Sequence, residues 1–245
     1  QTQKRKPWIM FFSMFFLIAT FSLWFAKPNM ENTFWILLAY TIGFVAVDFS
    51  TVFNNSMMPS LVKPSNLGKL SGSGWGLGYL GGLVSLIIML IFFVEQENGL
   101  TLLGNNPILG LNPEEREGTR IVGPLTAIWY LIFIVPFFIF VPEAKLATVN
   151  KLDVTKALKN LLSNIINLKN DKNLAWYLIS SMFYRDAMNA IFFFGGIYAA
   201  GVLEMSTVQL GLFGILAAST GTIGAYLGGI WDSKFGSKFC INIML

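Results

Sequence analysis

Histidine is absent from the 245 residues of this chain, and cysteine occurs once, at Cys240. Without histidine the chain can form no imidazole base, no Ser-His or Cys-His catalytic arrangement and no Cys/His zinc site. A single cysteine cannot close a disulfide within the chain. These absences argue against enzymatic activity, and we expect neither a cofactor nor a bound metal.

Charge is also scarce. Charged residues make up 12% of the sequence and hydrophobic residues 54%, whereas about a quarter of the residues of a soluble domain are charged. The charges cluster between long apolar runs, which is typical of helices in a lipid bilayer joined by loops in water. The net charge of +4 comes from basic residues in short loops beside these runs, so it indicates membrane orientation and not a nucleic-acid partner.

Six apolar segments are long enough for membrane-spanning helices, because a helix needs about 20 residues to cross a hydrocarbon core of about 30 Å. The alternation expected of barrel strands is absent, so we predict an all-α membrane protein. The expected spans are Trp8–Ala26, Asn32–Met57, Gly72–Val94, Ile121–Val141, Leu174–Val202 and Val208–Trp231.

The loops between these spans differ in basic residues. One side carries 13 lysines and arginines, whereas the other carries 3, namely Lys27, Arg116 and Arg120. By the positive-inside rule the basic side is cytoplasmic. We therefore expect both ends of the chain in the cytoplasm, in a bacterial inner membrane. Because the chain lacks an initiator Met and ends in a new apolar run, we expect it to be part of a longer protein.

The longest inner loop divides the spans into four and two. Residues 1–142 are expected to belong to an N-terminal helix bundle, residues 143–173 to a cytoplasmic linker, and residues 174–245 to the start of a C-terminal bundle. Within the linker, apolar residues recur at helical spacing beside several lysines. This pattern predicts an amphipathic helix, which either lies on the inner leaflet or packs on the ends of the bundle.

Glycines mark the third span. Gly74, Gly78 and Gly82 lie four residues apart on one face, while Gly72 and Gly76 lie on another. Small residues at this spacing let helix backbones approach closely in lipid. We expect the face of Gly74, Gly78 and Gly82 to be a tightly packed seam, which in a transporter can also slide.

Ionisable residues occur inside two spans. Arg185 and Asp186 lie near the middle of the fifth span, and Asp48 lies about two-thirds of the way along the second. A charge at the centre of a spanning helix costs about 2.5–3.5 kcal/mol on insertion scales, so each should face a cavity or a partner. These residues, with Asn189 and the nearby Asn54 and Asn55, are candidates for a solute or ion pathway. A structural pair such as Arg185 with Asp48, and amides that bridge helices, are the alternatives.

Several stretches resemble one known family. The segments from Val52 to Pro59 and from Gly68 to Gly82 are similar to the signature of the vacuole effluxer-like family of the major facilitator superfamily. The segment from Ala127 to Glu143 resembles that family's sixth helix, and the one from Tyr184 to Gly201 resembles its seventh. The family's eukaryotic member releases amino acids from the vacuole during autophagy.

The resemblance implies that the spans are helices three to eight of twelve, with the long inner loop as the link between the two halves. It also implies that Gly229, Asp232 and Gly236 belong to a repeat of the superfamily's cytoplasmic loop motif. This repeat departs from the usual pattern, since Ser233 occupies the acidic position and Ser237 an arginine position. Amino acids are the solute class that the resemblance implies.

Together these observations predict a secondary transporter that works by alternating access, driven by an ion gradient, a proton gradient or the gradient of its own small solute. No P-loop for ATP is present in the sequence. The alternative is a membrane receptor or scaffold that keeps a transporter fold without moving a solute.

Overall fold

A computed structural model describes residues 4–29, 31–96, 98–143 and 154–244 of the chain. These described residues form helices and no strand, as the sequence predicts. The chain divides into two compact units. Unit 1 consists of residues 1–3 and 145–210, and unit 2 consists of residues 4–144 and 211–245. The domain boundaries expected at residues 142 and 173 stay a prediction.

Five helical segments of the described residues are long and apolar enough to cross a membrane, and they match five of the six expected spans. They are Lys6–Phe25, Thr33–Leu61, Pro64–Phe92, Glu117–Phe140 and Val208–Phe235. The remaining expected span coincides with a 30-residue helix, α8 (Lys172–Gly201). This helix is not among the five because Arg185, Asp186 and Asn189, near its middle, lower its hydropathy. The count of six spans therefore stays a prediction.

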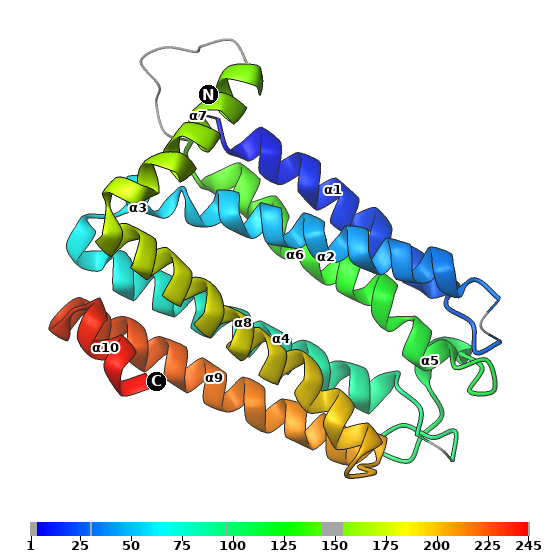
Figure 1. Ribbon diagram of the computed structural model, residues 1–245. Helices are drawn as coiled ribbons and strands as arrows, with labels where there is room; N and C mark the ends of the chain where they lie inside the picture. The colour runs from blue at the N-terminus through cyan, green and yellow to red at the C-terminus, as the bar shows by residue number, and fades with distance from the viewer. Residues whose placement is uncertain (1–3, 30, 97, 144–153, 245) are drawn as a thin grey trace. The chain divides into compact units, whose positions relative to one another are not determined.

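In unit 2, three long helices pack side by side (Figure 1): α1 (Lys6–Ser22), α2 (Thr33–Asn55) and α6 (Val122–Phe140). Tyr130 of α6 links them, because its hydroxyl lies 2.7 Å from the Ser13 hydroxyl of α1 and 3.4 Å from the Ser50 hydroxyl of α2. Both serines are buried. A buried hydroxyl needs such a partner where water is absent, so this contact fixes the register of the three helices.

Aromatic rings join α1 to α2 near the start of α1. Trp8 stacks on Phe53 with a centroid distance of 6.0 Å, and Phe12 stacks on Phe49 at 4.9 Å. Stacked pairs of this kind contribute about 0.5–1.5 kcal/mol each beyond the apolar area that they bury.

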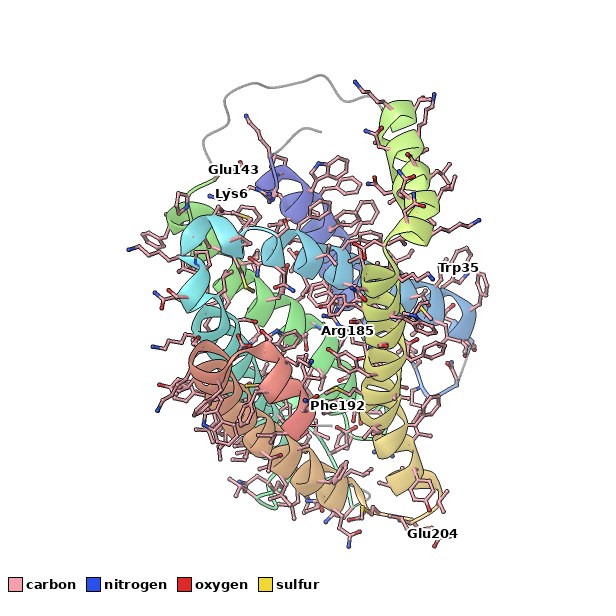
Figure 2. The ribbon with its side chains drawn as sticks, turned by 60° about the vertical axis from the view of Figure 1, so that its left-hand side comes forward. Lys6, Trp35, Glu143, Arg185, Phe192 and Glu204 are labelled. Carbon is pink, nitrogen blue, oxygen red and sulfur yellow. The ribbon has the colours of Figure 1, made fainter. Side chains whose placement is uncertain are left out.

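The first turn of α1 is held by a residue that follows α6. The carboxylate of Glu143 accepts hydrogen bonds from the backbone N–H groups of Arg5 and Lys6, and the Lys6 ammonium donates to the Phe138 carbonyl at 2.9 Å. Figure 2 labels Lys6 and Glu143 at this end of the helices. The first amides of a helix have no partner inside the helix and carry partial positive charge, so a carboxylate stabilises them.

The rest of unit 2 continues from α2 and returns after residue 210. A short helix, α3, and a 3-10 turn, η2, lead into α4, and an outer segment with η3 and α5 leads into α6. The last two helices are α9, which lies in this unit from Gly211 onward, and α10. Their bounds are α3 Met58–Leu61, η2 Pro64–Asn66, α4 Leu67–Phe92, η3 Ile108–Gly110, α5 Glu117–Arg120, α9 Thr207–Phe235 and α10 Ser237–Met244.

Unit 1 contains α7 (Val154–Asn167), a 3-10 turn η4 (Leu168–Asn170) and α8. Asp171 caps α8, since its carboxylate Oδ1 accepts a hydrogen bond from the Leu174 N–H at 3.0 Å. An N-cap aspartate fixes where a helix begins and typically contributes about 1 kcal/mol. The predicted amphipathic helix of the linker thus corresponds to α7, from residue 154 onward.

Candidate functional site at the seam between α4 and α9

Two helices that are far apart in the sequence, α4 and α9, meet through glycine (Figure 1). A Cβ atom built on Gly72 would lie 2.5 Å from the Cα of Gly229 and 2.6 Å from the Ala225 carbonyl oxygen. One turn further along, a Cβ on Gly76 would lie 3.3 Å from the Thr222 carbonyl oxygen. Real Cβ atoms do not approach backbone within 3.0 Å. Backbone therefore touches backbone at Gly72, with no side chain in between.

Further along the same helices the small residues lie on α9 and the large ones on α4. Side chains of α4 fill the space in front of the α9 glycines, between 2.6 and 3.1 Å from the position that a Cβ would occupy. The pairs are Tyr79 with Gly221, Leu86 with Gly214 and Leu90 with Gly211. The seam thus combines a backbone contact at one end with side chains set against glycines at the other.

The first turn of α4 is capped by a residue of α9. Asn66 precedes this helix but makes no side-chain cap. Instead, the Lys69 N–H donates a hydrogen bond of 3.0 Å to the hydroxyl oxygen of Ser233. The neighbouring carboxylate of Asp232 lies against the backbone of Gly68, where a Cβ would clash with it. A hydroxyl acceptor and a carboxylate both stabilise the electron-poor amides at a helix start.

Two of the predicted loop-motif residues therefore take part in this seam: Gly229 by its backbone contact and Asp232 by its position at α4. Gly236, the third, adopts a φ of +86° between α9 and α10, a conformation that favours glycine. The Gly236 N–H donates to the Asp232 carbonyl at 2.9 Å, and this hydrogen bond closes the last turn of α9.

An open cavity of about 650 Å³ lies beside the start of the seam. Lys69 supplies a cation to its wall, and Asn66, Ser73 and Tyr226 supply polar groups. The remaining lining residues are Val62, Leu70 and Ile230. The wall of this cavity is mainly apolar, and Lys69 is the one charged residue among the described residues that line it.

The glycines that meet α9 are not the three that were predicted to form a packed seam. Among the described residues, and apart from the nearby backbone of α4 itself, no atom lies within 4 Å of the positions that Cβ atoms would occupy on Gly74, Gly78 and Gly82. The glycines that pack on α9 are Gly72 and Gly76, because Gly229 and the carbonyl groups of Ala225 and Thr222 face that side of α4. A packing role of the other three glycines against another helix stays a prediction.

Two of the predicted pathway residues, Asp48 and Asn55, lie on one face of α2. Asp48 and Asn55 are seven residues apart, which is about two helical turns, and both side chains are exposed, as is Asn54. On α8, Arg185, Asp186 and Asn189 are also exposed; Figure 2 labels Arg185. Within the described part of unit 1, neither Arg185 nor Asp186 forms an ion pair.

Sequence reasoning missed Glu95, which lies after α4. Its side chain is only 1% exposed. One carboxylate oxygen accepts a hydrogen bond of 3.0 Å from the Thr119 hydroxyl, and the other has no partner among the described residues. No pattern in the sequence marks it, because an acidic residue in a Gly- and Asn-rich loop is normally solvated.

Among the described residues, five helices are long and apolar enough to cross a membrane, which is the pattern of a multi-pass membrane protein. A family model described as "Vacuole effluxer Atg22 like" matches residues 1–245. The chain therefore belongs to this family of membrane transporters, as the resemblance implied. No curated protein and no solved structure matches the chain.

Proposed function

We propose that the chain forms part of a secondary transporter that moves a small solute by alternating access. The observation that carries this proposal is the contact of Gly72 with Gly229, where α4 and α9 meet backbone to backbone. In alternating access, one group of helices rocks against another around a solute site. At Gly72 no side chain lies between the two backbones, so none has to move aside when this end of the seam opens.

Ser233 and Asp232 complete this proposed gate. They hold the first turn of α4 while the seam is closed, and water can replace them at the exposed amides when the seam opens. The hydrogen bond at this end of the seam then adds only a small energetic difference between closed and open, because one hydrogen bond contributes about 0.5–1.5 kcal/mol. A small difference suits a transporter that must populate both states.

The proposed topology has six spans, with α8 as the additional one, and corresponds to helices three to eight of a twelve-helix major facilitator protein. The start of α4 and the end of α9 lie on the basic side of the chain, so the closed seam would form a gate at the cytoplasmic face. The expected bacterial inner membrane stays a prediction.

Amino acids are the solute class that we propose, in keeping with the family's description as an effluxer. An amino acid carries a carboxylate and an ammonium group, so a pathway for it needs both a cation and an anion. Arg185 and Asp186 supply one of each on α8, with Asn189 one turn on. Arginine in particular recognises carboxylates through two parallel hydrogen bonds. Asp48 and Asn55 supply a second polar face on α2, and either aspartate could carry a coupling proton.

The test is a flux screen on the complete gene product in proteoliposomes. Labelled amino acids would be loaded inside or supplied outside, with and without a pH gradient. We expect saturable movement of at least one amino acid, faster than in protein-free vesicles. A receptor or scaffold would bind a solute without moving it, so binding in the absence of flux would contradict the proposal.

A further inference from the structure

The helix α7 has one apolar face and one polar face. At about 100° per residue, Leu158, Leu161, Leu162, Ile165 and Ile166 fall within an arc of about 140°. Lys156, Asn160, Ser163 and Asn167 occupy the opposite side, and Lys159 lies at the boundary between the two faces. The five apolar side chains are 54–63% exposed. Such a face is normally covered, because apolar surface in water is unfavourable.

The helix is too short to cross a bilayer. Its 14 residues extend about 21 Å at about 1.5 Å per residue, whereas the hydrocarbon core is about 30 Å thick. A strongly amphipathic helix of this kind, with lysines on its polar side, is typical of a helix that lies in the membrane interface.

The start of α8 places α7 at the level of the interface. The turn η4 and the Asp171 cap join the two helices directly. Trp176 and Tyr177, in the first turns of α8, are 68% and 62% exposed. Tryptophan and tyrosine concentrate where a spanning helix leaves the hydrocarbon core. Because α7 ends shortly before these two residues, it lies at the level of the lipid headgroups.

The charge of α7 is of one sign. From Val154 to Asn170 the sequence holds three lysines and no acidic residue. Anionic headgroups attract such a segment, with about 1 kcal/mol, or about fivefold in affinity, for each lysine near the surface.

We propose that α7 is a membrane-surface helix that inserts its apolar face into the inner leaflet and binds anionic lipid headgroups through Lys156 and Lys159. This inference rests on the topology proposed above, which places α7 on the cytoplasmic side. It gives the transporter a lipid-binding element outside the solute pathway. The occupant of the exposed face is thus the bilayer itself, and not the helix bundle or a soluble partner.

The experiment uses the complete gene product in vesicles, with Cys240→Ser and a single new cysteine carrying an environment-sensitive fluorophore. Leu162→Cys places the probe on the apolar face, and Asn160→Cys, two residues away on the polar face, is the matched control. One quencher is attached to the lipid acyl chain and the other, iodide, is dissolved in water. We expect the lipid quencher to act on position 162 and iodide to act on position 160.

Other results would overturn the proposal. Quenching of position 162 by iodide as strong as at position 160 would show that the apolar face is in water. Protection of position 162 from both quenchers would show that it packs on protein, either the bundle or a partner. Because the readout is fluorescence and not flux, a negative result here is distinct from a failure of the proposed transport.

A second comparison tests whether α7 binds anionic headgroups in preference to neutral ones. Vesicles of phosphatidylcholine alone are compared with vesicles of equal parts phosphatidylcholine and phosphatidylglycerol. We expect stronger lipid quenching at position 162 in the anionic vesicles. The double variant Lys156→Gln and Lys159→Gln should lower the ratio of inserted to released helix about 25-fold in those vesicles. Equal quenching of the parent protein in both vesicle types would overturn the binding of anionic lipid.

Discussion

Gly72 and Gly229 touch each other through their backbones: a Cβ atom on Gly72 would lie 2.5 Å from the Gly229 Cα, and one on Gly229 would lie 2.8 Å from the Gly72 Cα. These two residues are 157 positions apart and belong to α4 and α9. Their contact requires glycine on both helices, since neither backbone can move aside without separating the helices.

Gly72→Ala should destabilise the protein. The new methyl group would meet the backbone of Gly229 and Ala225, and overpacking of this kind costs about 1–3 kcal/mol. This exceeds the gain of up to about 1 kcal/mol that alanine brings to a helix. The matched control is Gly78→Ala on the same helix, where the methyl group enters open space. Thermal unfolding of the purified protein checks the prediction, and an equal Tm for both variants would contradict it.

Ser233→Ala should loosen the first turn of α4. The change removes the acceptor of the Lys69 N–H, and the loss of a helix cap costs about 1 kcal/mol. Hydrogen exchange of a peptide that contains Lys69 should become faster, while Ser233→Thr, which keeps the hydroxyl, should leave it near the parent rate. Unchanged exchange in Ser233→Ala would show that this hydrogen bond does not stabilise the first turn of α4 in solution.

The spans were predictable from the sequence, whereas their pairing was not. An apolar run of sufficient length determines a spanning helix locally. For this reason α1, α2, α6 and α9 begin or end within a few residues of the bounds expected for their spans. The fourth helix, α4, begins five residues before the expected Gly72, because Leu67 to Ser71 continue the helix beyond the apolar run.

The face of α4 that packs could not be predicted from the sequence of this helix alone. Its glycines offer two faces with the same spacing, and the local pattern does not distinguish them. The choice depends on Gly229, a residue of another helix. The contact between Lys69 and Ser233 is non-local in the same way, since 164 positions separate the two residues. The burial of Glu95 likewise depends on Gly118 and Thr119, which approach it only in the fold.

Topology can be tested with single cysteines in the Cys240→Ser background. Lys63→Cys lies between α3 and α4, and Asn105→Cys lies in the segment between α4 and α6; both positions are exposed. The positive-inside rule puts the first in the cytoplasm and the second outside. A membrane-impermeant maleimide added to intact cells should label position 105 alone. Labelling of position 63 from outside would reverse the proposed orientation.

Asp186→Asn distinguishes a role in transport from a role in folding. If Asp186 contacts the solute or its coupling ion, the variant should keep its expression and Tm and lose most flux, because the amide keeps the shape and loses the charge. If the carboxylate only neutralises a cation, the change should cost about 3–5 kcal/mol for a well-buried pair. We expect the first outcome. Recovery of flux in the double variant Asp186→Asn and Arg185→Gln would contradict it.

In the proposed mechanism the α4–α9 seam opens during each transport cycle, and a reversible cross-link tests this opening. Lys69→Cys and Ser233→Cys, combined with Cys240→Ser, place one thiol on the first turn of α4 and one on the end of α9, at the two residues that the backbone N–H of Lys69 joins to the Ser233 hydroxyl at 3.0 Å. The variant is reconstituted, oxidised, assayed for amino-acid flux and then reduced. Each single-cysteine protein, treated with the same oxidant, is the control. We predict that the disulfide stops flux and that reduction restores it. Flux at the uncross-linked rate while the disulfide is intact would show that transport does not require the α4–α9 seam to open.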